Sequence, residues 1–142
     1  MPSTEVSDLR SLATDLLTAI ALRRREDLPA LLTDDVTWWV PLSAAARGLT
    51  RPLRGKDGVL GLLGGDNSHY RTGTMRWEFH DVLQDGERVV VHCTLRALTR
   101  DGVDYENHYL MLYRFAGDRI AEAWEYTDTA YAFGRFDTPA SP

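Results

Sequence analysis

Two carboxylates near the end of the last predicted strand, Glu125 and Asp128, are the residues best suited to acid–base chemistry. A carboxylate held in an apolar cavity has a raised pKa and can accept or donate a proton near neutral pH. On a regular strand the two side chains would point to opposite faces, so both reach one cavity only if the strand bulges or breaks at Thr127. The structural alternative is that one of them caps the strand end or pairs with an arginine at the rim.

Asn107 and Tyr109 are the candidates for polarising a substrate oxygen. They occupy alternate positions of a predicted strand over 103–115 and therefore share one of its faces. A buried amide and a buried phenol could orient a carbonyl or stabilise an enolate oxygen. A structural polar stripe, or a face that pairs with a second copy of the chain, is the alternative.

Two of the four histidines fall near the predicted pocket. His92, a residue type suited to proton transfer near neutral pH, lies in the middle of a predicted strand over 87–99. Its parity is opposite to that of the core residues around it, and the sequence does not show which face lines the pocket. His69 lies in the loop after the third predicted helix, at the expected mouth. For both, a purely structural role is the alternative.

Flat and apolar side chains would form the walls of the pocket and suit an aromatic or polycyclic ligand. The predicted lining comprises His69 at the mouth together with Trp38, Val40, Trp77, Met111, Trp124 and Tyr126. An aromatic-rich core is the alternative interpretation. The histidines lack the fixed spacing of metal ligands, so we expect no metal site.

The elements that must position these residues come in two groups. Apolar residues at three- and four-residue spacing predict three helices, over about 6–24 (with Ser7 as N-cap), 27–32 and 56–63. A short strand over 36–40 and an irregular loop over 42–55 lie between the second and third helices. Alternating residues then predict four long antiparallel strands between Met75 and Tyr126, joined by tight turns.

This order predicts an α+β fold in which a strongly curved antiparallel sheet forms a cone-shaped barrel packed on three N-terminal helices. The open end of such a cone forms a pocket lined by the inner face of the sheet. Residues 1–136 are predicted to form the single domain, and 137–142 a disordered C-terminal tail.

Composition excludes several classes of protein. The chain has 142 residues, the length of one domain, and its 16 basic against 21 acidic residues give a net charge of −5. That charge argues against nucleic-acid binding. The single cysteine, Cys93, allows no internal disulfide. With neither a membrane-spanning run nor a signal peptide in the sequence, we expect a cytoplasmic location and no membrane partner.

Three stretches of the sequence resemble the SnoaL-like branch of the nuclear transport factor 2-like superfamily, which includes polyketide cyclases and ketosteroid isomerase-like proteins. They are an acidic strand ending in proline over 34–41, an Arg-Gly-Lys-Asp helix opening over 54–59, and a last strand over 119–128 followed by Tyr131 and Phe133. The resemblance implies the same cone-shaped fold and a homodimer formed through the sheet. These motifs are specific for the fold and only weakly specific for the chemistry.

No catalytic set of the superfamily is complete in this chain. Val40 stands where ketosteroid isomerases of this fold carry their general base, and Ala19 stands near their oxyanion tyrosine. Polyketide cyclases of the branch place an aspartate directly after the last-strand tryptophan; Glu125 is the longer counterpart, while their preceding histidine is replaced by Ala123. The second acid of limonene epoxide hydrolases is missing at Val90.

The resemblance and the residues together favour an enzyme that cyclises or isomerises a hydrophobic, carbonyl-bearing metabolite, polyketide- or steroid-like, by acid–base chemistry without a cofactor. Glu125 or Asp128 would move the proton, and Asn107, Tyr109 or His92 would polarise the oxygen. Two alternatives stay open: an epoxide hydrolase of the limonene epoxide hydrolase type, and a non-catalytic module that binds a small hydrophobic molecule or pairs with a second copy.

Overall fold

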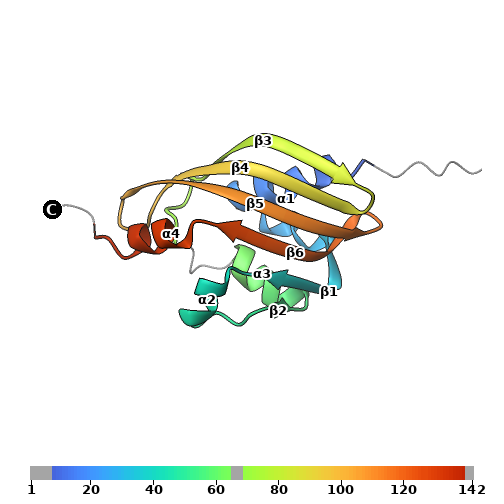
Figure 1. Ribbon diagram of the computed structural model, residues 1–142, viewed down its shortest axis with the longest axis horizontal. Helices are drawn as coiled ribbons and strands as arrows, with labels where there is room; N and C mark the ends of the chain where they lie inside the picture. The colour runs from blue at the N-terminus through green and yellow to red at the C-terminus, as the bar shows by residue number, and fades with distance from the viewer. Residues whose placement is uncertain (1–7, 65–68, 140–142) are drawn as a thin grey trace, which may run out of the picture.

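The computed structural model describes residues 8–64 and 69–139, which form one curved sheet with helices around it (Figure 1). The helices are α1 (Arg10–Ala21), α2 (Leu42–Ala46), α3 (Lys56–Gly64) and α4 (Thr129–Phe136), with two short 3₁₀ helices, η1 (Arg25–Asp27) and η2 (Pro29–Leu31). The strands are β1 (Leu32–Trp39), β2 (Leu53–Arg54), β3 (Arg76–Asp85), β4 (Arg88–Leu98), β5 (Asp104–Ala116) and β6 (Arg119–Thr127).

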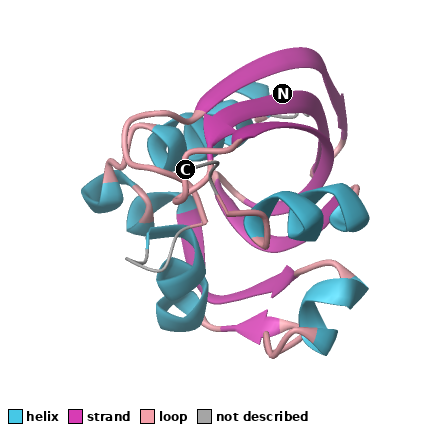
Figure 2. Ribbon diagram, turned by 90° about the vertical axis from the view of Figure 1, so that its left-hand side faces the viewer, coloured by secondary structure: helices cyan, strands magenta, loops and turns pink. Residues whose placement is uncertain are grey.

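The six strands lie in the order β2-β1-β6-β5-β4-β3. The predicted meander β3–β6 is confirmed, and each of its strands pairs antiparallel with the next. β1 joins β6 in parallel, and β2 adds the far edge. The sheet curves strongly (Figure 2) but does not close, which corrects the predicted barrel. The edge strand β3 contacts α1 and the edge strand β2 contacts α3, and the two edge strands do not pair with each other.

Several local predictions are also corrected. The segment predicted as a loop over 42–55 contains α2 and β2, and the second predicted helix is replaced by η1 and η2. The residues after β6 form α4, because Asp128 caps this helix with a bond from Tyr131 N–H to its Oδ1 (3.0 Å). The predicted tail is described as far as Pro139; residues 140–142 and the expected cap Ser7 lie outside the described residues.

Helix α1 packs its apolar stripe on one face of the sheet, as the spacing predicts. Its start is tied to β3, since Leu9 N–H donates to Gln84 Oε1 (2.9 Å) and so one unpaired amide of the first turn is satisfied. We call the face that carries the buried residues Val89, Val91 and Cys93 the inner face, and the opposite one the outer face. The alternation of the strands then places every candidate residue on one or the other.

Candidate functional site

Glu125 lies on the inner face of β6, in register with the buried Met111 of β5. The indole of Trp38, from β1, donates Nε1–H to Oε1 of Glu125 (3.3 Å). Within residues 8–64 and 69–139, Oε2 makes no hydrogen bond and the carboxylate has no ion-pair partner. Burial raises the pKa of Glu125 above its ordinary value, and the bond from Trp38 offsets only part of this rise. The side chain is therefore a carboxylate with one anchored oxygen and one oxygen available to a ligand.

Asp128 does not share this environment. It is exposed at the end of β6, and its carboxylate is engaged as the cap of α4. The strand ends at Thr127, where sequence reasoning required a break, but the break starts a helix and does not turn Asp128 inward. Asp128 therefore has a structural role, as the N-cap of a helix that the sequence reading did not predict.

A chain of phenols lies on the inner face between Glu125 and the end of the sheet at α4. Tyr105 and Tyr109 lie four residues apart on β5, and their hydroxyls are hydrogen-bonded at 2.7 Å. The Tyr109 hydroxyl is also hydrogen-bonded to that of Tyr70, at 3.2 Å. Burial raises the pKa of Tyr70 and of Tyr109 well above the ordinary value of 10.0, so these phenols keep their protons. The predicted site residue Tyr109 is thus buried and faces inward, with its hydroxyl between two other phenols.

Asn107 is committed to structural hydrogen bonds. Its Nδ2 donates to the Tyr105 hydroxyl (3.0 Å) and to the Asp128 carbonyl (2.9 Å), while its Oδ1 accepts from His108 N–H (2.9 Å). The carbonyl can only accept and the amide N–H can only donate, so the orientation of the side-chain amide is unambiguous. Asn107 therefore connects β5 to the β6–α4 junction and orients Tyr105. Its side-chain amide is fully hydrogen-bonded within the protein.

Two buried polar atoms on the inner face have no hydrogen-bond partner within the described part of the chain: the hydroxyl of Tyr113 and Nε1 of Trp77. Tyr113 is fully buried on β5, and its ring contacts the Trp38 ring edge-to-face at 6.1 Å. Burial, and then the nearby Cys93 and Glu125, raise the pKa of Tyr113 well above its ordinary value. Tyr113 shares its face with Asn107 and Tyr109 in the sequence, but no pattern in the sequence indicates that its hydroxyl is unpaired.

The mouth of the inner face is covered by α4. Phe136 stacks on His69 (ring centroids 4.1 Å apart) and on Tyr105 (5.4 Å). An open hollow of about 300 Å³ lies here, lined by His69, Thr99, Arg100, Asp101 and Phe136. His69 lines this hollow, and burial, with the positive charges of Arg47 and Arg100, lowers its pKa.

A double ion pair holds α4 in this position. Arg47, directly after α2, donates two hydrogen bonds to Asp137 (2.7 and 3.0 Å), and its guanidinium lies 4.3 Å from the centre of the Phe133 ring. The Arg47 guanidinium lowers the pKa of Asp137. Tyr131 adds a contact to β5 by accepting a hydrogen bond from Glu106 N–H (3.0 Å).

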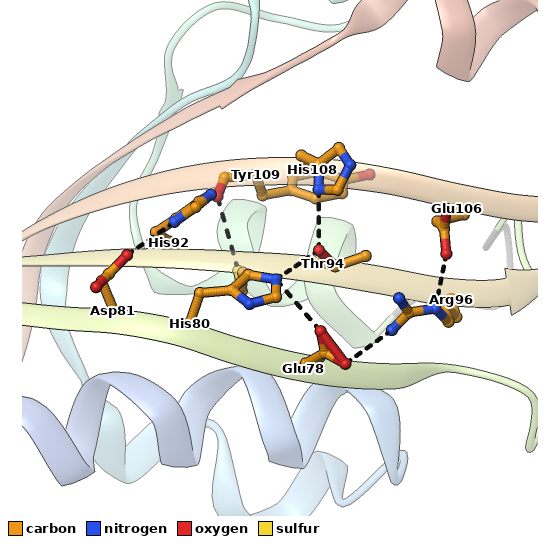
Figure 3. A network of polar contacts seen from close by, with 10 residues as sticks. Glu78, His80, Asp81, His92, Thr94, Arg96, Glu106, His108 and Tyr109 are labelled. Carbon is orange, nitrogen blue, oxygen red and sulfur yellow. Dashed lines mark hydrogen bonds and ion pairs between the residues drawn. The ribbon is translucent and has the colours of Figure 1, made fainter.

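His92 faces outward, which corrects its predicted place in the pocket. Its Nδ1 lies 3.0 Å from Oδ2 of Asp81, and its ring lies 5.0 Å from that of His80 (Figure 3). In the same network the buried Thr94 hydroxyl bridges His80 Nε2 (2.8 Å) and His108 Nδ1 (2.9 Å). The reason is the parity of β4: Val91 and Cys93 pack inward, so the residue between them must point out.

The predicted pocket walls divide in the same way. Trp38, Val40, Trp77 and Met111 lie on the inner face or in the core. Trp124 and Tyr126 lie on the outer face: Trp124 stacks under the Arg88 guanidinium (5.6 Å), and Tyr126 is 59% exposed. Their assignment to the pocket was wrong, because they alternate with the inward-facing Ala123 and Glu125.

No three histidine, cysteine or acidic side chains in residues 8–64 and 69–139 are grouped so that they could hold a metal ion. Among the described helices, none has the length and apolar character needed to cross a membrane.

Comparison with known proteins identifies the fold. A family model described as SnoaL-like domain matches residues 13–123. An NTF2-like protein of unknown function from Burkholderia pseudomallei is similar in structure, with a TM-score of 0.81 at 23% identity, over 93% of this chain and 99% of the other. IdmH, a putative polyketide cyclase from Streptomyces antibioticus, gives a TM-score of 0.75 at 21% identity, over 93% and 100%.

A putative SnoaL-like polyketide cyclase from Jannaschia sp. gives a TM-score of 0.70 at 10% identity, over 97% of this chain and 100% of the other. A search of curated protein sequences finds no match. At these identities the similarities establish the NTF2-like fold and leave the chemistry to the residues of the site.

Proposed function

Because this chain belongs to the SnoaL-like domain family, we propose that it is a cofactor-independent enzyme that isomerises or cyclises a hydrophobic, carbonyl-bearing small molecule by proton transfer. The observation that carries the proposal is Glu125, a half-buried carboxylate without a counter-charge in the described chain, whose Oε2 is available while Trp38 fixes Oε1. Structural neighbours that are putative polyketide cyclases support the substrate class.

The proposed step is enolisation. Oε2 of Glu125 takes a proton from the carbon next to the substrate carbonyl; the C–H electron pair forms a C=C bond, and negative charge moves onto the carbonyl oxygen. Return of the proton to another carbon isomerises the substrate, and attack of the enolate carbon on a second carbonyl cyclises it. Burial supports this role, because a carboxylate with a raised pKa is a stronger base than one in water.

Of the alternatives, a ligand-binding module gains support from the structure. The inner face carries apolar and phenolic side chains around one carboxylate, an environment that would also hold a ligand without reacting with it. Water activation by two carboxylates, as in an epoxide hydrolase, lacks such support, since Asp128 is exposed and caps α4.

The test uses 2-tetralone, a bicyclic ketone with acidic hydrogens next to its carbonyl, in deuterated buffer. We expect the wild type to catalyse exchange of these hydrogens, followed by NMR, and Glu125→Gln to lower the rate by about 10²–10⁴-fold. Glu122→Gln is the matched control, because Glu122 lies on the same strand but on the outer face, where it accepts a bond from Trp39 Nε1. Exchange that survives in Glu125→Gln contradicts the proposal; tight binding without exchange by the wild type favours the binding module.

We also propose that two copies pair through the outer face. Across the strands, this face carries two rows that include the exposed Leu83, Leu110 and Tyr126 (63%, 47% and 59%). Charged groups flank these rows on both sides and pair within the chain: Arg114 pairs with Glu122 on one side, and Arg96 pairs with Glu78 and Glu106 on the other. The exposed apolar side chains between them are therefore the part of this face that a second copy would cover. Sedimentation should show a dimer that Leu110→Arg dissociates, while Leu42→Arg on α2 leaves it intact; a monomeric wild type contradicts this.

A further inference from the structure

The two unpartnered polar atoms of the inner face, the Tyr113 hydroxyl and Trp77 Nε1, carry an inference about the ligand. A buried donor without a partner costs about 1–3 kcal/mol, so native proteins rarely keep one. Here two occur on the face that also holds Glu125. The neighbouring phenols, by contrast, are joined to one another and to Asn107. On the inner face, the three phenols and Asn107 therefore have hydrogen-bond partners, whereas the Tyr113 hydroxyl and Trp77 Nε1 have none in the described chain.

The two atoms lie at different positions along the strands of the sheet. Trp77 pairs with Leu95 of β4, and Leu95 with Asn107 of β5, so Trp77 belongs to the half of the sheet nearest α4. Tyr113 lies six residues further along β5, which is at most about 20 Å of strand. It lies beside Glu125: the Trp38 indole bonds the Glu125 carboxylate and its ring contacts the Tyr113 ring.

We propose that Tyr113 and Trp77 are specificity-determining residues for an elongated ligand with two oxygen functions, one carbonyl between Tyr113 and Glu125 and one hydroxyl or carbonyl oxygen at Trp77. This assignment rests on the proposed function. The indole N–H can only donate, so its partner must be an acceptor. The Tyr113 hydroxyl stays protonated, because its pKa is raised. It would donate a hydrogen bond to the oxygen on which charge develops during enolisation.

The assignment also replaces part of the sequence-based site. Asn107 and Tyr109 were expected to polarise the oxygen, but their polar atoms bond other protein groups. Tyr113 and Trp77 are the side chains whose bonding capacity is unused. A ligand bound on the inner face would supply the missing partners of these two atoms.

Two matched ligands test the proposal: 2-tetralone, with one oxygen, and 6-hydroxy-2-tetralone, with oxygens at opposite ends of the same bicyclic skeleton. By calorimetry we expect the wild type to bind the hydroxylated ligand at least about tenfold more tightly, a difference of about 1.4 kcal/mol. Trp77→Phe should remove this preference. Tyr113→Phe should weaken binding of both ligands and slow deuterium exchange of 2-tetralone. Failure of the wild type to bind either ligand, or equal affinity for the two, overturns the proposal.

Stability measurements separate this role from a structural one. Because its hydroxyl lacks a partner and little else is removed, Tyr113→Phe should leave the melting temperature unchanged or raise it. Tyr105→Phe is the control, since it removes a hydroxyl with two hydrogen bonds and should lower the melting temperature. A similar loss in Tyr113→Phe would reveal an internal partner and overturn the proposal.

Failure of this inference and failure of the proposed function give different results. If Glu125→Gln stops exchange while Tyr113→Phe exchanges and binds like the wild type, proton transfer stands and the assignment of Tyr113 is wrong. If Glu125→Gln exchanges normally while the two aromatic variants still lose ligand affinity, the proposed enzyme is wrong and the ligand assignment stands.

Discussion

The two faces of the sheet use similar polar residues in opposite ways. On the outer face, charges and imidazoles bond one another beside water: Arg96 bridges Glu78 and Glu106, and His92 contacts Asp81 (Figure 3). On the inner face a single carboxylate, Glu125, lies among phenols and apolar side chains. Desolvation raises the pKa of Glu125, whereas the outer-face groups are partly exposed and form ion pairs with one another. The environment of a polar side chain therefore follows the face more than the residue type.

The largest difference between the faces should appear in the pH dependence of catalysis. Below the raised pKa of Glu125, the rate of 2-tetralone exchange should rise about tenfold per pH unit, and it should level off above that pKa. Trp38→Phe should move the midpoint to higher pH, because the hydrogen bond that lowers this pKa is lost. Trp39→Phe, which loses a bond to the outer-face Glu122, should leave it in place. A midpoint that stays fixed in Trp38→Phe would place the titrating group elsewhere.

The free energy of unfolding should also depend on the ionisation of Glu125. It should fall as pH rises, whereas the exchange rate rises. Because the folded-state pKa of Glu125 lies above its unfolded value, its contribution to stability is fully present below the unfolded pKa and is lost as pH rises through the folded pKa. Glu125→Gln, which cannot ionise, should lose stability less steeply over this range in denaturant titrations. Parallel curves for the two proteins would contradict a desolvated Glu125.

Next in size is the effect of removing the inner-face amide. Asn107→Ala should lower the free energy of unfolding by about 2–4 kcal/mol, since it leaves a cavity and several buried polar groups without partners. Urea denaturation measures this. Glu106→Ala, one residue earlier on the outer face, should have a small effect, because its side chain is exposed. Equal losses would remove the energetic distinction between the faces.

A smaller loss is expected at the polar centre of the outer face. Thr94→Val keeps the shape of the buried side chain but removes the hydroxyl between two histidines, and should cost about 1 kcal/mol. Exchange of 2-tetralone should be unaffected. A catalytic defect in this variant, with stability retained, would show that the outer face communicates with the site.

The smallest effect is expected at His92. His92→Asn should change the exchange rate by less than about twofold, against the 10²–10⁴-fold expected for an acid–base residue. Its ring lies on the outer face beside Asp81, away from Glu125. A large loss of activity in a folded His92→Asn variant would contradict the assignment of His92 to the face away from the site.

Much of the fold follows from patterns along the chain. The spacing of Leu9, Leu16 and Leu17 predicts α1, and alternation with tight turns predicts β3–β6, because burial of one face imposes these periods. Helix α4 was missed because Tyr131 and Phe133 were assigned to a family tail and its cap, Asp128, was considered for catalysis, although Ala132, Phe133 and Phe136 have helical spacing. The parallel pairing of β1 with β6 joins segments far apart in sequence, which local patterns do not encode.

For the site, the sequence by itself determined that Glu125 stands next to a last-strand tryptophan, that Asn107 and Tyr109 share a face, and that His69 follows the third helix. Only the tertiary structure decided which face is dry, because that depends on where α1 and α3 pack. It also decided which polar atoms are bonded and which are not. Hydrogen bonding and desolvation are properties of three-dimensional neighbours, so the spent amide of Asn107 and the unpaired hydroxyl of Tyr113 become visible only in the folded chain.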